Sequence, residues 1–173
     1  MSKKIKNISI TGIGIALFVV LSLCLQVPVF ENYYLCLGYV VMAVYCYCVG
    51  TVSGTLVGVL GTVIYCIMIK GKRGMPGWAL GNLIIGINLG IAFKVIKKLG
   101  KPKLEFFILV VAIIATTAAG ILFAKSVLEC VLYSQPILVR MANNIYGFIA
   151  DAFVLIVSLP LCRFLEPHLK KYL

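Results

Sequence analysis

A few polar side chains interrupt the apolar second half of the chain, and their types and spacing suit the binding of a small molecule or a proton. Asn144, Phe148 and Asp151 are spaced i, i+4 and i+7, so they share one face of a helix. Asp151 lies 11 residues beyond Arg140, which is about 16 Å along a helix axis. A carboxyl group at that depth can bind a ligand, carry a proton or hold neighbouring polar groups in place. These roles of Asp151 stay open at this point.

Two further pairs of polar residues each have a structural and a functional interpretation. Trp78 and Asn82 stand one helical turn apart, and the indole can anchor a helix at an interface or stack on a planar ligand. Lys125 and Glu129 have the same spacing and form either a surface ion pair or part of a pocket mouth. Apolar walls with a few converging polar groups are typical of small-molecule sites. The pattern therefore predicts an outward-facing cavity walled by the last three helices.

The sequence contains no pattern for ATP use, metal-assisted hydrolysis or nucleophilic catalysis. Neither a phosphate-binding GxxxxGK[ST] stretch nor an HExxH pair occurs, and the one histidine, His168, lies near the C-terminus. The seven cysteines lack CxxC spacing, so we expect small apolar side chains rather than a disulfide framework or a metal site. No catalytic residue, no metal and no cofactor are expected.

The elements that carry these residues must be membrane helices. Of the 173 residues, 62% are hydrophobic and 12% are charged, and the mean hydropathy is +1.11. Soluble domains have about 45–50% apolar and about 25% charged residues. The composition excludes an ordinary cytosolic enzyme, a disordered regulator and a nucleic-acid-binding module. The net charge of +11 is spread between apolar runs, as expected for a protein whose main solvent is the lipid bilayer.

Six apolar runs predict an all-α integral membrane protein with one domain covering 1–173. A spanning helix needs about 20 apolar residues. The predicted helices are 8–26, 35–49, 52–69, 78–96, 104–132 and 137–165. A polar loop at 30–34 separates the first two. A basic, glycine-rich loop at 70–77 either folds over the cavity as a lid or is simply solvated.

The distribution of Lys and Arg predicts the orientation in the membrane. An even number of helices places both termini on one side. That side carries 11 basic residues and the opposite side carries five. Cytoplasmic loops are enriched in Lys and Arg, so a multi-pass protein with both termini in the cytoplasm is expected. The basic N-terminal start leads into a first helix that we expect to be retained rather than cleaved.

Small residues recur at four-residue spacing in three of the predicted helices. The pairs are Gly12 and Ala16, Gly54 and Gly58, and Gly86 and Gly90. Such faces let helix backbones approach closely in lipid. We expect packing inside the bundle for the second and third pairs.

The order of these features resembles the substrate-binding S component of energy-coupling factor (ECF) transporters. The resemblance covers most of the chain and is carried by 33–39 (YYLCLGY), the small-residue third helix and 77–86 (GWALGNLIIG). It implies a six-helix bundle in a bacterial cell membrane. The implied partners are a vitamin-like substrate, captured from outside, and a shared transmembrane coupling subunit with two ABC ATPases. No nucleic acid is involved.

The resemblance also implies roles for particular residues. Gly12 and Ala16 match the small-residue face with which the family's first helix docks on the coupling subunit. Tyr39 stands where many riboflavin-type relatives have an aspartate, which argues against riboflavin as the substrate. Aromatic rings would stack on a planar ligand, and amides and charges would bond its edge. The expected substrate-binding residues are Tyr33, Tyr34, Trp78, Asn82, Lys125, Asn144 and Asp151.

Three other functions fit parts of the sequence. A small proton-coupled transporter would use Asp151 as its proton carrier. A membrane enzyme acting on lipid would need a cluster of acids or a nucleophile beside a base, which the sequence does not display. A purely structural subunit would have no need of polar residues gathered towards the outer side.

Overall fold

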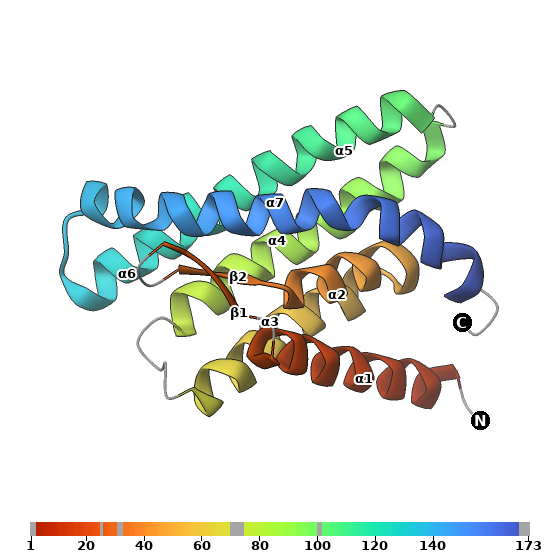
Figure 1. Ribbon diagram of the computed structural model, residues 1–173, viewed down its shortest axis with the longest axis horizontal. Coiled ribbons are helices and arrows are strands. Elements are labelled where there is room, and N and C mark those ends of the chain that lie inside the picture. The colour runs from red at the N-terminus through yellow and green to blue at the C-terminus, as the bar shows by residue number, and fades with distance from the viewer. Residues whose placement is uncertain (1–2, 25, 31–32, 70–74, 100–101, 170–173) are drawn as a thin grey trace.

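The protein is a helical bundle, seen in a computed structural model that describes residues 3–24, 26–30, 33–69, 75–99 and 102–169 (Figure 1). Two π-helical segments extend its α-helices: Tyr45–Val49 continues α2, and Ala118–Lys125 joins α5 to α6. A short 3-10 turn, Lys97–Leu99, ends α4. The α-helices are α1 (Lys3–Cys24), α2 (Gly38–Val44), α3 (Thr51–Met68), α4 (Met75–Ile96), α5 (Pro102–Thr117), α6 (Ser126–Tyr133) and α7 (Ile137–Leu169).

Five helical stretches of the described chain are long and apolar enough to cross a membrane, and a sixth is shorter. The long ones are Ile5–Cys24, Thr51–Met68, Met75–Ile96, Leu104–Tyr133 and Ile137–Leu169, and the shorter one is Gly38–Val49. Large apolar side chains such as Ile8, Val52 and Leu138 are more than 70% exposed, as suits a surface in contact with lipid. The all-α membrane fold expected from the sequence is confirmed.

The prediction was wrong for the first loop and for the start of the second helix. The first helix ends at Cys24, and the loop is an antiparallel hairpin of β1 (Gln26–Phe30) and β2 (Tyr33–Cys36). The second helix begins only at Gly38 and is about 18 Å long, against about 30 Å of hydrocarbon. The hairpin pairs backbone groups that lipid cannot satisfy, and β2 packs against α7. An extended segment can therefore complete the bundle beside a short helix.

The other helix bounds differ from the predicted ones in ways that matter for the site. α4 begins at Met75 rather than 78, so Trp78 lies in its first turn. The predicted helix 104–132 is a continuous rod with a π-helical segment at Ala118–Lys125, which offsets the faces of α5 and α6. α7 reaches Leu169 and contains Pro160.

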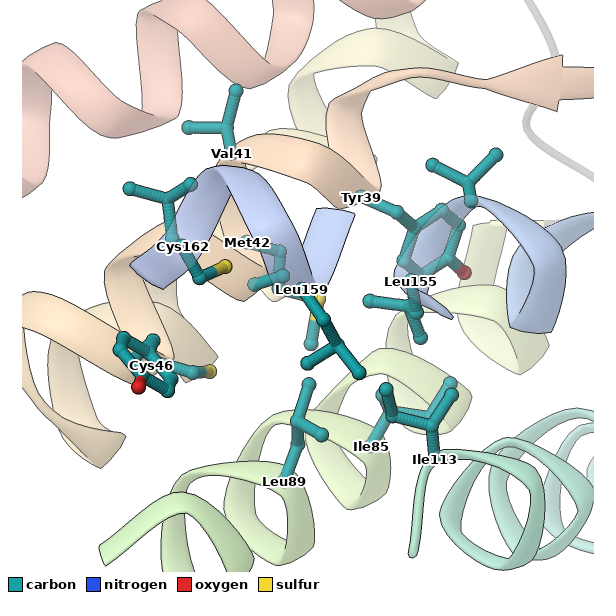
Figure 2. Packing of buried hydrophobic residues seen from close by; sticks show 14 of the residues in the cluster. Tyr39, Val41, Met42, Cys46, Ile85, Leu89, Ile113, Leu155, Leu159 and Cys162 are labelled. Carbon is teal, nitrogen blue, oxygen red and sulfur yellow. The ribbon is translucent and has the colours of Figure 1, made fainter. Parts of the chain in front are cut away.

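The core lies where α2, α4, α5 and α7 meet (Figure 2). Leu155 and Leu159 of α7 are almost completely buried, and so are Met42 of α2, Leu89 of α4 and Ile113 of α5. Figure 2 shows Leu159 directed towards Leu89 and Ile85 of α4. Because α2 is enclosed on several sides, its residues are set more firmly than those of the lipid-facing helices.

Glycines bring neighbouring helices into close contact inside the bundle, as predicted for the pairs at 54/58 and 86/90. A Cβ atom on Gly86 would lie 2.8 Å from the Cα of Thr55, and one on Gly90 would lie 2.7 Å from the Cα of Thr51. A Cβ atom on Gly54 would lie equally close to the backbone of Cys46, at 2.7 Å from its Cα. These helices therefore use their small residues for packing inside the bundle.

A second glycine contact joins α4 to the π-helical segment, and it supports a stability prediction. A Cβ atom on Gly120 would lie 2.7 Å from the carbonyl oxygen of Gly81, which belongs to a rigid helix. We expect Gly120→Ala to lower the free energy of unfolding by about 1–3 kcal/mol through overpacking. Thermal unfolding in detergent measures it. Gly12→Ala is the control, since nothing lies within 4 Å of that position, and equal stability of the two variants would contradict the contact.

Candidate functional site

The polar side chains singled out in the sequence gather in the half of the bundle away from both termini. In Figure 1 the N- and C-termini lie at one end, and the turn between α6 and α7 lies at the other. Two groups occur there: an inner group on α2, α3, α4 and α7, and an outer group on the π-helical segment, α6 and α7.

The inner group is centred on the hydroxyl of Tyr39, which is completely buried. Trp78 Nε1 donates to this hydroxyl at 2.8 Å, and the hydroxyl donates to Asn82 Oδ1 at 2.6 Å. The carboxyl group of Asp151 lies near enough to Tyr39 for the two groups to interact electrostatically. One phenol therefore connects α2 to α4 by hydrogen bonds, and holds the indole of Trp78 in a fixed orientation.

Asn82 accepts the hydrogen bond of Tyr39 and is itself held by α3. Its amide nitrogen donates to Thr62 Oγ1 at 2.5 Å and to the carbonyl oxygen of Gly58 at 3.3 Å, so its oxygen must face Tyr39. Asn82 has no exposed surface. The donors and the acceptor of this amide are thus occupied inside the protein, which makes Asn82 a residue that positions the inner group.

Asp151 is 6% exposed and lies on the inward face of α7. Besides Tyr39, the thiol of Cys36 on β2 and the amine of Lys125 are near enough to interact with it electrostatically. A carboxyl group at membrane depth needs such neighbours, because an isolated charge there costs roughly 2.5–3.5 kcal/mol on insertion scales.

The outer group is centred on the carboxylate of Glu129, which is 4% exposed. Asn144 Nδ2 donates to Glu129 Oε2 at 3.2 Å and to Ser126 Oγ at 2.9 Å. Lys125 Nζ and Arg140 Nη1 each lie 3.9 Å from a Glu129 oxygen. These two distances exceed the usual 2.7–3.2 Å of a hydrogen bond, so both cations are attracted to Glu129 without being bonded to it.

Local backbone features bring these side chains together. Ser134 adopts a left-handed conformation with φ of +52° and ends α6 abruptly, so α7 turns back and places Arg140 beside Glu129. Gly77, at the start of α4, leaves room for the outer group: a Cβ atom there would lie 3.0 Å from Lys125 Cγ and 3.1 Å from Glu129 Cγ.

The structure brings five of the seven expected substrate-binding residues into these two groups: Trp78, Asn82, Lys125, Asn144 and Asp151. The backbone of Tyr33 and Tyr34 lies in β2, and their side chains fall outside the described residues, as does most of the basic loop at 70–77. The surface alternative for Lys125 and Glu129 is wrong, because Glu129 is buried.

Sequence reasoning did not include Tyr39, Glu129 and Arg140 among the expected binding residues. Tyr39 follows a glycine in an apolar run and carries no local signal of its role. Arg140 and Asn144 are spaced i, i+4, and this spacing could have joined Arg140 to the polar face of α7.

A cavity of about 560 Å³ lies at the opposite end of the bundle, around the start of α3 and the end of α4. Its lining includes Asn7, Gly50, Thr51, Lys94 and Lys97, and none of the expected substrate-binding residues. Lys97 is held by the carbonyl oxygen of Tyr47 at 2.7 Å and by Glu166 at 2.9 Å. Within the described chain, no three His, Cys, Asp or Glu side chains are grouped so as to hold a metal ion.

On the first helix, Gly12 and Ala16 face outward, whereas Gly14 faces inward. Gly12 and Ala16 are exposed, and Gly12 has open space around it. A Cβ atom on Gly14 would collide with the ring of Tyr45 and with Val57. The outward small-residue face of α1 is therefore not used for packing within the described chain.

Comparison with known proteins gives a family match over nearly the whole chain. The family model for the ECF-type riboflavin transporter, S component, matches residues 2–166. UPF0397 proteins from two strains of Streptococcus thermophilus are 28% identical to the chain over 90 residues, which is 52% of this chain and 49% of each relative. The chain thus matches about half the length of these curated relatives. No solved structure matches it.

Proposed function

Since the chain belongs to the family of ECF-type riboflavin transporter S components, we propose that it captures a vitamin or vitamin precursor on the outer side of the membrane. The captured molecule then passes through a partner transmembrane subunit powered by two ATPases. S components are transport subunits, and ATP hydrolysis would belong to the partners. The multi-pass helical bundle agrees with this family.

The observation that carries the proposal is the hydrogen bond from Trp78 to the buried hydroxyl of Tyr39 at the centre of the inner group, with the carboxyl group of Asp151 nearby. An indole held by a buried phenol is a rigid, flat surface, and rigid aromatic groups bind planar ligands with little loss of conformational entropy. We assign stacking to Trp78, together with Tyr33 and Tyr34 of β2. Polar contacts are assigned to Lys125, Asn144 and Asp151, and Asn82 positions Tyr39.

The charges at the end that carries the termini support the proposed orientation, with both termini in the cytoplasm. Lys94, Lys97, Lys98 and Arg163 lie at that end, and Lys and Arg are enriched on the cytoplasmic side. With both termini in the cytoplasm, the inner and outer groups lie in the outward half of the membrane. A capture subunit needs its site there.

The test is native mass spectrometry of the detergent-purified protein, titrated with a panel of vitamins and vitamin precursors. We expect one small molecule to be held tightly and to be lost in Trp78→Ala and in Asn144→Ala. The matched controls are Phe107→Ala, an aromatic residue 67% exposed on α5, and Asn88→Ala, whose amide bonds only its own helix. If both site variants retained the ligand, Trp78 and Asn144 would not belong to the binding site.

The burial of Asp151 also supports a second candidate, a small proton-coupled transporter. That function predicts uptake into vesicles driven by a proton gradient alone and lost in Asp151→Asn. Such uptake, together with no binding from the vitamin panel, would replace the capture function by the proton-coupled one.

The outward small-residue face of α1 is proposed as the docking face for the coupling subunit. We expect Gly12→Leu and Ala16→Leu to abolish uptake in vesicles containing the complete transporter, while ligand binding to the isolated protein stays unchanged. Bulky side chains there would block the close approach of a partner helix. Ala115→Leu, at an exposed position of α5, is the control. Normal uptake in the two α1 variants would exclude this face.

A further inference from the structure

Arg140 holds a buried donor that no group of the described residues satisfies. Among the described side chains, its Nε is the one buried nitrogen or oxygen atom without a hydrogen-bond partner. Leaving such a donor unpaired costs about 1–3 kcal/mol, and more for a charged group. Buried donors without partners are few in native proteins, and each calls for an explanation such as an absent ligand.

The surroundings of Arg140 do not supply the missing acceptor. Its closest acid, Glu129, is 3.9 Å away from Nη1 and accepts a hydrogen bond from Asn144 instead. Glu129 is also shared with Lys125, so two cations face one carboxylate. The second acid of this region, Asp151, is 11 residues further along α7 and lies near Tyr39.

The guanidinium is nevertheless held in place. It lies over the ring of Tyr133, 5.5 Å from the ring centre, at the end of α6. Its side chain is 23% exposed, so one edge remains accessible. An arginine with a fixed plane and free N–H groups matches the two oxygens of a carboxylate or the oxygens of a phosphate.

We propose that the outer group recognises an acidic group of the captured molecule, a carboxylate or a phosphate, and that Arg140 is the residue that binds it. This inference rests on the proposed capture function. The planar part of the molecule would lie towards Trp78, and its acidic group would lie between Arg140 and Lys125. The acid supplies acceptors for the guanidinium of Arg140 and balances the second cation.

The test compares acidic and neutral forms of the same compounds: nicotinate with nicotinamide, pantothenate with pantothenol, and biotin with biotin amide. Binding to the full-length protein in detergent is measured by titration monitored by the fluorescence of its single tryptophan and by native mass spectrometry. For any pair that binds, we expect the acidic form to bind about tenfold more tightly or better. Arg140→Gln should abolish that preference, and Arg140→Lys should restore only part of it.

Arg163→Gln is the matched control, because it removes the same charge at the opposite end of the bundle, where Arg163 pairs with Glu105 at 3.6 Å. Thermal unfolding of each variant verifies that it is folded. Equal or tighter binding of the neutral forms, or an equal loss of both forms in Arg140→Gln, would overturn the inference and leave the capture function in place. If neither the six compounds nor any other vitamin bound, both the role of Arg140 and the capture function would be overturned.

Discussion

Tyr39→Phe is expected to destabilise the protein far more than the loss of one hydroxyl group normally does. The variant keeps the ring, which packs edge-on against Phe18 with 6.2 Å between the ring centres. It removes the acceptor of Trp78 Nε1 and the donor to Asn82 Oδ1, both within the inner group. Each unpaired buried group costs about 1–3 kcal/mol. Because the indole is then no longer held in place, ligand affinity should fall as well.

The measurement for Tyr39→Phe is thermal unfolding in detergent, combined with fluorescence. The chain has one tryptophan, so its emission reports directly on Trp78. Tyr45→Phe is the matched control: its hydroxyl donates a single hydrogen bond, to the carbonyl oxygen of Ile10, at a part-buried position. If Tyr39→Phe were no less stable than Tyr45→Phe and its emission were unchanged, the hydroxyl would not organise the site.

Glu129→Gln is expected to have the largest effect on stability. Glu129 is the ion-pair partner of both Lys125 and Arg140 in the outer group. Removing one partner of a buried ion pair costs about 3–5 kcal/mol, because the remaining charge is left uncompensated. The glutamine can still accept the hydrogen bond from Asn144, so the loss reports on charge rather than on that hydrogen bond. Chemical unfolding in detergent measures the difference in free energy.

Two further variants make this result specific. Glu105→Gln is the control, because its carboxylate pairs with a single cation, Arg163, at 3.6 Å. The double variant Glu129→Gln with Arg140→Gln removes one cation together with the acid, and should recover part of the stability. If the double variant lost as much free energy of unfolding as the two single variants together, Arg140 and Glu129 would not interact.

Much of the fold could be predicted because lipid restricts what a chain can do. An apolar solvent requires helices long enough to cross it and leaves no backbone group unpaired. Run length and composition therefore predicted five long helical stretches within a few residues. The start of the second helix was wrongly predicted, because a hairpin also pairs its backbone groups. An apolar run by itself does not distinguish a strand from a helix.

The site could be predicted only in part, for a similar reason. Polar residues in apolar runs are conspicuous, so Asn82, Asn144 and Asp151 were recognisable from their depth alone. Their partners were not recognisable. Tyr39 is one of nine tyrosines, and nothing local distinguishes it from Tyr45, which bonds a backbone carbonyl on α1 instead.

The sequence by itself determined that this is a helical membrane protein with polar residues at defined depths, since hydropathy and spacing are properties of each segment alone. The tertiary structure decided which faces meet. It placed Gly14 against Tyr45 while leaving Gly12 open, joined Trp78 to Asn82 through Tyr39, and buried Glu129 between two cations. These relations depend on the rotation and crossing of helices distant in sequence, and the packing of the whole bundle sets them.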